Sequence, residues 1–170
     1  TENFDAGTTI PTGWTVINGG DANTWTIIDF TGANISAYSG ANAVGIGYGS
    51  TAHDDYLVTP AITVTAGVSD HLSFWGRSRD PLFPEVISVK ISTTGTAPAN
   101  FTVVLDPNVA PSSGASFYKY QYDLTPYIGQ TIYVGFYSST TDMFYFDIDD
   151  VEVTALPACL APTNPLVAGV

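Results

Sequence analysis

The segment FYFDIDDVEV, residues 144–153, reads as a β-strand whose alternation of apolar and polar residues shifts phase in its middle. Successive residues of a strand point to opposite faces of its sheet. The expected apolar face therefore consists of Phe144, Phe146 and Ile148. The same phase would place the carboxylate of Asp150 on this face and turn Val151 away from it. Because an unpaired buried charge is very costly, we predict a local distortion of the strand at Asp149–Asp150.

Short strand-like segments recur along the rest of the chain, and no segment keeps a convincing helical period of 3.6 residues. Together with 143–154, the segments predicted as strands are 14–18, 24–30, 43–48, 55–58, 71–76, 86–92, 101–106, 117–123 and 131–137. Turn-forming sequences such as PTG, NGGD, SGAN and YIGQ separate them. This pattern predicts an all-β fold, an antiparallel β-sandwich of jelly-roll type. We expect one helical turn in DLTPYIG.

The chain of 170 residues is long enough for one well-buried core, and we assign residues 1–155 to a single jelly-roll domain. The segment that follows, ALPACLAPTNPLVAGV, contains three prolines and no strand alternation until its end. Residues 156–170 are therefore interpreted as a linker that leads into a following domain. Because the chain opens in mid-pattern with TENFDAG, we expect it to be one module of a longer protein, with targeting segments elsewhere.

The charge balance restricts the classes of partner. The chain has 16 acidic and 4 basic residues, for a formal net charge of −12. Nucleic acids and anionic membranes attract clustered Lys and Arg, so this balance argues against both. No run approaches the roughly 20 apolar residues of a membrane-spanning helix, so we expect no membrane insertion. A strongly acidic chain suits divalent cations or neutral ligands.

The cysteine content and the general composition suggest a compartment. The single Cys159 excludes an internal disulfide framework and a cysteine-based zinc site. A low lysine content with abundant Thr, Ser, Gly and Tyr is typical of secreted or cell-surface bacterial modules. We therefore expect a secreted or surface location.

A set of ordered motifs across residues 2–153 resembles a known family. The motifs are ENFD, PTGWTVINGGDANTW, DDYLVTPAITV, LSFWGRS, EVISVKISTTGTAPANFTVVLD, YDLTPYIGQTIYVGFYS and FYFDIDDVEV. Their combination resembles the cleaved-adhesin modules, which are related to MAM-like jelly rolls and are repeated in the haemagglutinin/adhesin regions of gingipain-type secreted proteases. It is also similar to the choice-of-anchor modules of secreted bacterial proteins. The tail CLAPTNPLV looks like the first strand of a fibronectin type III domain.

The resemblance implies a jelly roll with structural Ca²⁺, without catalytic activity, that serves adhesion or substrate targeting for a larger secreted protein. Binding targets in the family vary and include host or matrix proteins, haem-proteins and glycans, so the target does not transfer to this chain. We expect a monomeric module tethered to neighbouring domains. Two alternatives from other classes stay open: a polysaccharide-acting enzyme on the same scaffold, and a purely structural spacer.

Candidate Ca²⁺ ligands come from the acidic residues near strand ends, because Ca²⁺ prefers carboxylate and carbonyl oxygens. In a jelly roll the first and last strands lie side by side, which would bring Asp5 and Asp150 together at a sheet edge. The family positions that match acidic ligands are occupied here by Asp5, Asp21, Asp54, Asp149, Asp150 and Glu85. One or two ions are expected. On this interpretation Asp150, and not Asp147, carries the calcium-dependent stability.

Candidate ligand-binding residues are aromatic or cationic. Trp14, Trp25 and Trp75 match core positions of the family. A stripe of tyrosines alternates with Lys119 and Gln121; it consists of Tyr118, Tyr120 and Tyr122. Burial of this stripe is the ordinary expectation, and an exposed platform that stacks on sugar rings is the alternative.

Two further candidates come from the loop between residues 76 and 86, where Phe83 offers an exposed aromatic ring. Arg79 is a possible anchor on a binding rim, although pairing of the two arginines of this loop with Asp80 or Glu85 is the preferred interpretation. We predict no catalytic residues. The two histidines lack a nucleophile motif, and His53 is expected to be solvent-exposed.

Overall fold

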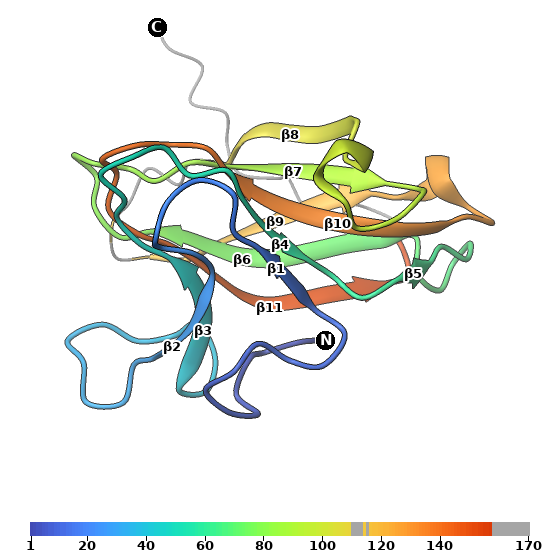
Figure 1. Cartoon of the computed structure of the whole chain (residues 1–170). Coiled ribbons are helices and arrows are strands. Elements are labelled where there is room, and N and C mark those ends of the chain that lie inside the picture. The colour runs from blue at the N-terminus through green and yellow to red at the C-terminus, as the bar shows by residue number, and fades with distance from the viewer. Residues whose placement is uncertain (110–113, 115, 158–170) are drawn as a thin grey trace, which may run out of the picture.

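Two antiparallel sheets pack face to face in the computed structural model of the chain (Figure 1). The structure describes residues 1–109, 114 and 116–157. The predicted linker over 156–170 and its fibronectin-like start therefore lie almost entirely outside the described residues, as does Cys159. Within the described part, the β-sandwich of jelly-roll type predicted from the strand pattern is confirmed.

The six-stranded sheet is built from strands that are far apart in the sequence. Its order is β1 (Thr15–Ile17), β4 (Asp55–Val58), β10 (Thr131–Ser138), β7 (Ile87–Ser92) and β8 (Val103–Val109), with β5 (Ile62–Thr63) paired to the start of β10. The alternation in β7 holds as predicted: Ile87, Val89 and Ile91 are buried in the core, and Lys90 lies on the outer face.

The five-stranded sheet has the order β2 (Thr26–Asp29), β3 (Asn42–Ile46), β11 (Phe146–Thr154), β6 (His71–Ser78) and β9 (Tyr118–Asp123). All ten predicted strands are present. The two-residue β5 is too short to produce a period-2 pattern. The predicted helical turn is the 3-10 helix η2 (Thr125–Tyr127), and a second 3-10 turn is η1 (Pro98–Asn100). No helix among the described residues has the length and apolarity that crossing a membrane requires.

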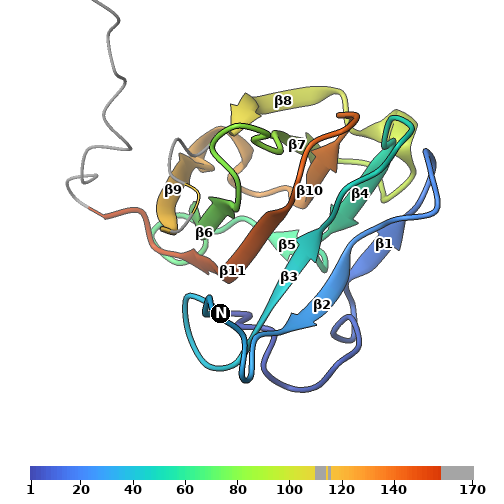
Figure 2. The same ribbon diagram turned by 90° about the vertical axis from the view of Figure 1, so that its left-hand side faces the viewer.

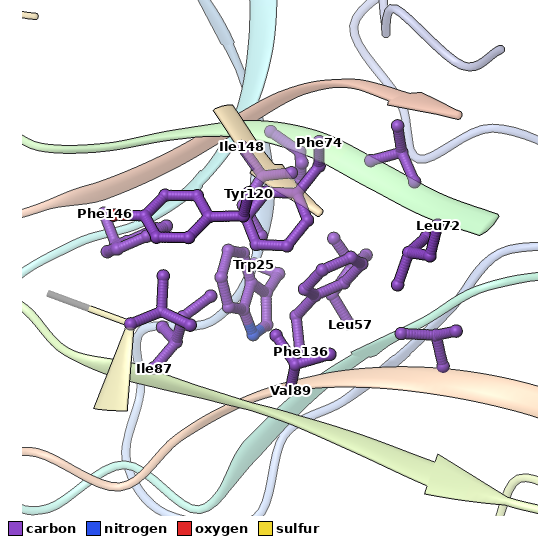
Figure 3. Close-up of a cluster of buried hydrophobic side chains, with 14 of the residues drawn as sticks. Trp25, Leu57, Leu72, Phe74, Ile87, Val89, Tyr120, Phe136, Phe146 and Ile148 are labelled. Atoms are coloured by element: carbon purple, nitrogen blue, oxygen red, sulfur yellow. The ribbon is translucent and has the colours of Figure 1, made fainter. Parts of the chain in front are cut away.

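Trp25 fills the centre of the interface between the sheets. Its indole is 1% exposed and lies between Phe146, Ile148 and Tyr120 of one sheet and Ile87 and Phe136 of the other (Figure 3). Trp14 is partly buried at the rim of this core, where its ring meets Phe4 edge-on. The core placement of these two tryptophans is as predicted.

The phase shift in the last strand is a β-bulge. Asp149 pairs with Trp75 and Glu152 pairs with Ser73, so Asp150 and Val151 together face Phe74. Asp150 adopts a left-handed φ of 45°, a conformation that favours glycine and that Asp tolerates better than most residues. The extra residue returns the side chain of Val151 to the core, where it is 5% exposed.

The segment before the bulge differs from the prediction at one end. Phe144 lies outside β11 and is 43% exposed, so the predicted apolar face of the strand begins at Phe146. Phe144 instead belongs to the β10–β11 loop, whose backbone bonds to the β6–β7 loop: the Phe144 N–H donates to the Phe83 carbonyl at 3.0 Å.

The start of the chain lies beside the bulge. Glu2 and Val151 exchange two backbone hydrogen bonds of 2.8 and 2.9 Å. β3 pairs with β11 only over Phe146–Ile148, and β6 occupies the other side, so the first residues continue the sheet where β3 stops. Figure 2 shows the N-terminus beside this end of β11. The two ends of the domain meet as predicted, but β11 lies inside its sheet and not at an edge.

The tyrosine stripe of β9 faces the core. Tyr120 is 8% exposed and stacks on Phe74 with ring centroids 5.2 Å apart, and Tyr118 and Tyr122 pack against the same cluster. The alternative of an exposed sugar-stacking platform at these tyrosines is therefore wrong. Lys119, on the opposite face, approaches Glu152 at 4.0 Å.

Trp75 corrects another expectation, because it does not enter the core. It follows the buried Phe74 in β6 and therefore points to the outer face of the five-stranded sheet. There it stacks under Tyr38, with centroids 3.9 Å apart and an angle of 14° between the rings. The β2–β3 loop thus covers an outer face that a simple two-layer sandwich would leave exposed.

The contrast between these two tryptophans gives a test of the fold. Trp25→Ala should lower the free energy of unfolding by about 3–5 kcal/mol, because it leaves a large cavity between the sheets. Trp75→Ala removes a half-buried ring and mainly its stacking on Tyr38, worth about 0.5–1.5 kcal/mol beyond area burial. Urea unfolding measures both changes. Equal losses from the two substitutions would contradict the packing described.

Candidate functional site

Several loops meet at one end of the sandwich. The β3–β4, β6–β7 and β10–β11 connections gather at the left of Figure 1, and the β1–β2 loop reaches the same end. They bring together a group of buried polar side chains, which we call the loop-end cluster. It comprises Asp21, His53, Asp55 and Glu85 with the hydroxyls of Ser138 and Thr140.

Asp55, the first residue of β4, is completely buried. Its Oδ1 accepts hydrogen bonds from the backbone N–H groups of Gly19 at 3.1 Å and Gly20 at 3.4 Å. These two bonds tie the β1–β2 loop to β4. Its Oδ2 is buried without a hydrogen-bond partner. A buried carboxylate oxygen without a partner is costly, so this atom marks a place where a ligand would be stabilising.

Asp21 and His53 form a close pair beside Asp55. The Nδ1 atom of His53 lies 3.1 Å from Oδ1 of Asp21, and their side chains are 1% and 7% exposed. One ligand atom from each of Asp21, His53 and Asp55 falls within 4.8 Å of the others. The expectation that His53 is solvent-exposed is therefore wrong. The close approach needs a glycine at position 49, because a Cβ there would lie 2.0 Å from Asp21 Oδ2.

Glu85 completes the cluster from the β6–β7 loop. Its Oε1 accepts hydrogen bonds from the Ser138 hydroxyl at 2.9 Å and from the Thr140 hydroxyl. Its Oε2 is a second buried carboxylate oxygen without a partner. Burial raises the pKa of Glu85, and the two hydroxyl bonds and the nearby His53 offset part of this effect. The backbone N–H of His53 donates to the Thr140 carbonyl at 3.0 Å. Hydrogen bonds to Thr140 therefore connect the β10–β11 loop directly to the β3–β4 loop through His53 and to the β6–β7 loop through Glu85.

This donor set fits a hard divalent cation. Asp21 and Asp55 supply carboxylate oxygens of the kind that Ca²⁺ prefers, within 4.8 Å of each other and of a His53 ring nitrogen. One oxygen of Asp55 and one of the neighbouring Glu85 have no hydrogen-bond partner. The sequence prediction named Asp21, Asp54 and Glu85 for this region. The structure brings Asp21 and Glu85 into the cluster with Asp55. Asp54 is exposed, and its Oδ1 accepts a hydrogen bond from the Tyr137 hydroxyl at 3.1 Å. The choice of Asp54 rests on the family resemblance, although the strand is correctly predicted to begin at Asp55.

The other predicted acidic residues bind backbone N–H groups of a single segment, the β2–β3 loop and the start of β3. Asp5 Oδ1 accepts from the N–H groups of Ala41 and Asn42 at 2.9 Å. Asp149 Oδ2 accepts from the N–H groups of Tyr38 and Ser39 at 3.0 Å. We call this set, with Asp150, the bulge cluster.

The bulge cluster differs from the predicted site in which side chain is buried. Asp149 is completely buried, and Asp150 is partly exposed and accepts from the Ser39 hydroxyl at 2.8 Å. Burial raises the pKa of Asp149 to about 6, although three backbone N–H groups partly stabilise its charge. As Ca²⁺ ligands, Asp5, Asp149 and Asp150 stay a prediction.

Asp147 has a role that the sequence pattern did not reveal. It is completely buried on the outer face of β11, where its carboxylate binds two guanidinium groups. Arg77 donates through Nε and Nη2 at 3.0 and 2.6 Å, and Arg79 through Nε and Nη2 at 2.9 and 2.7 Å. The preferred pairing of the arginines with Asp80 or Glu85 is therefore wrong. Asp147 is also unsuitable as a neutral reference for Asp150, because removing it would leave the buried Arg77 and the partly exposed Arg79 without their carboxylate.

Phe83 is the predicted ligand-binding residue that lies in a surface hollow. We call this hollow the loop-end pocket. It has a volume of about 190 Å³ and is lined by Tyr48, Phe83, Asp142, Met143 and Phe144. Arg79 is bound to Asp147 with its side chain 14% exposed, and it does not line this pocket.

Comparison with known proteins gives three relevant matches. The sequence model of the Cleaved Adhesin Domain family matches residues 1–153. Hemagglutinin A of Porphyromonas gingivalis is 32% identical over 178 residues, which cover 90% of this chain and 7% of the relative. The crystal structure of the K1 cleaved adhesin domain of Lys-gingipain from P. gingivalis W83 superimposes with a TM-score of 0.74 at 27% identity, covering 92% of this chain and 97% of that domain.

A carbohydrate-binding module has the same fold. TmCBM61, solved with β-1,4-galactotriose, matches with a TM-score of 0.61 at 17% identity over 92% of this chain and 100% of that one. At this identity the likeness concerns the fold alone. The chain spans about a tenth or less of the length of the curated relatives that it matches.

The raised pKa of Asp149 predicts a pH dependence of the metal-free protein. Between about pH 4 and pH 6 the folded state binds more protons at this residue than the unfolded state, so its contribution to stability is present at pH 4 and is lost as the pH rises through about 6. The difference in free energy of unfolding between the wild type and Asp149→Asn should therefore fall over this range. Chelator-treated protein unfolded in urea at several pH values measures it. A difference that is constant from pH 4 to pH 6.5 would contradict the prediction.

Proposed function

Because the chain belongs to the cleaved adhesin domain family, we propose that it is a non-catalytic, calcium-stabilised module that binds a glycan or protein target on behalf of a larger secreted or cell-surface bacterial protein. The observation that carries the proposal is the family match over residues 1–153. The short fraction of each relative that the chain covers supports a role as one module among others. We propose that it is monomeric and tethered to neighbouring domains.

The loop-end cluster supports the calcium part of the proposal. Asp21 and Asp55 would hold the ion, with His53 beside them and Glu85 as a further proposed ligand, and an ion there would satisfy the Asp55 oxygen that has no partner. Ca²⁺ would act by charge compensation and by cross-linking loops from both sheets. A second ion at the bulge cluster, near Asp5, Asp149 and Asp150, is proposed on the family resemblance.

A matched pair of substitutions tests the cation site. At a Ca²⁺ concentration about 100 times the Kd, binding to the folded state stabilises it by about 2.7 kcal/mol, which raises the Tm by about 5–10 °C in a domain of this size. Asp55→Asn should lose most of this increase, because the substitution removes a charge from the cluster and leaves its shape. Asp54→Asn, one residue earlier and exposed, should keep it.

Thermal unfolding followed by circular dichroism, with EDTA and then with millimolar Ca²⁺, measures both variants. No increase in the Tm of the wild type would refute calcium stabilisation. An equal loss in the two variants would place the ion elsewhere, and Glu85→Gln then distinguishes the loop-end cluster from the bulge cluster.

A binding experiment tests the function itself. We expect the chain to be retained on one or more immobilised neutral polysaccharides or host-matrix proteins, and to release no reducing sugar from any polysaccharide that retains it. Release of reducing ends would favour the alternative of a polysaccharide-acting enzyme. Absence of retention on a broad array, with the protein folded in Ca²⁺, would favour the alternative of a structural spacer.

A further inference from the structure

Exposed aromatic side chains converge at the loop-end pocket. Tyr48, Phe83 and Phe144 are 47%, 52% and 43% exposed, and they come from the β3–β4, β6–β7 and β10–β11 loops. Leu82, next to Phe83, is 81% exposed. Soluble proteins rarely gather large apolar groups on the surface without a function, and three rings from three separate loops form the walls of a single hollow.

The backbone of the pocket is fixed by hydrogen bonds between its loops. The Phe144 N–H donates to the Phe83 carbonyl, and the Asp142 N–H donates to the Gly49 carbonyl, both at 3.0 Å. The side chain of Asn23 donates to the Tyr48 carbonyl. Gly49 in turn lies against Asp21 of the loop-end cluster. The backbone positions that carry the rings are therefore fixed before any ligand arrives, which reduces the entropy cost of binding.

The size and polarity of the pocket restrict its occupant. Its volume of about 190 Å³ is below the roughly 300–1,000 Å³ of sites for drug-sized ligands, so it holds one ring or one side chain. Among the described residues that line the pocket, Asp142 alone has a charged side chain. Its carboxylate can accept hydrogen bonds from hydroxyl groups, whereas the pocket walls are otherwise apolar. The net charge of −12 disfavours an anionic ligand.

We propose that the loop-end pocket binds one neutral pyranose ring of a glycan. A pyranose presents apolar C–H groups on its faces and hydroxyl donors at its edge. The aromatic rings would contact a face, and Asp142 would accept hydroxyl hydrogen bonds. This assignment deepens the proposed function and rests on it, because it chooses the glycan over the protein target.

The test is an NMR titration of ¹⁵N-labelled protein in Ca²⁺ with the methyl pyranosides of glucose, galactose, mannose and xylose. We expect at least one of them to shift the amide signals of Phe83, Phe144 and Gly49. Phe83→Ala should weaken this binding by about ten-fold or more, because it removes a wall of the pocket. Leu82→Ala is the matched control, since Leu82 is more exposed but does not line the pocket, and it should change the Kd by less than two-fold.

Asp142 provides the second variant. It has a left-handed φ of 61°, which Asn tolerates, so Asp142→Asn should keep the loop conformation and remove only the charge. We expect this variant to bind the same pyranoside several-fold more weakly, because hydrogen bonds to a charged acceptor are stronger.

Several results would overturn the assignment. The first is that no pyranoside shifts the pocket signals; the second is that Phe83→Ala and Leu82→Ala weaken binding equally. Pocket shifts with N-acetylphenylalanine amide, but with no pyranoside, would identify an apolar side chain of a protein target instead. If Phe83→Ala is retained on the immobilised array as well as the wild type, the pocket assignment fails while the proposed function stands. If the wild type itself is not retained on the array, the proposed binding function is refuted, and the pocket assignment, which rests on it, falls with it.

Discussion

The need to stabilise buried carboxylates governs much of this structure. Within the described residues, four acidic side chains are completely buried: Asp55, Glu85, Asp147 and Asp149. Each has its own compensation. Two guanidinium groups surround Asp147, backbone N–H groups bind Asp149 and Asp55, and hydroxyls bind Glu85. Each carboxylate accepts at least one of these bonds from a segment distant in the sequence, so the carboxylates join loops and strands that are far apart in the chain.

The oxygens of the buried carboxylates all have hydrogen-bond partners on one side of the molecule, but not on the other. Asp147 and Asp149 lie on the outer face of the five-stranded sheet, and their partners hold the β2–β3 loop over Trp75. Asp55 and Glu85, at the loop end, each keep one oxygen without a partner. The polar groups of the first place are therefore satisfied within the fold, whereas two carboxylate oxygens of the second are not, and the exposed aromatic rings lie near them.

Period-2 alternation was sufficient to predict the strands, the sandwich and the irregularity at Asp149–Asp150, because each strand has one face in a common core. Residues on the outer face were predicted less well. The family resemblance placed Trp75 in the core, and no role was predicted for Asp147, since nothing local indicates that the β2–β3 loop covers that face. The loop-end cluster was predicted in part: the predicted bounds of β4 were correct, but the family resemblance favoured Asp54 over Asp55, and the burial of His53 depends on the distant Asp21.

The direction of β11 has a mechanical consequence. The loop that carries Asp142 and Phe144 enters β11 at Phe146, and the chain leaves the strand at the opposite end, at Thr154. A pulling force between a ligand held at the loop end and the chain beyond Thr154 would act along the strand axis. β11 is hydrogen-bonded to β3 and β6 on its two sides, so the force would shear many bonds together and would not peel them apart one by one. Forced unfolding depends on the unfolding rate, and this geometry lets the domain carry tension along a strand that is hydrogen-bonded on both sides.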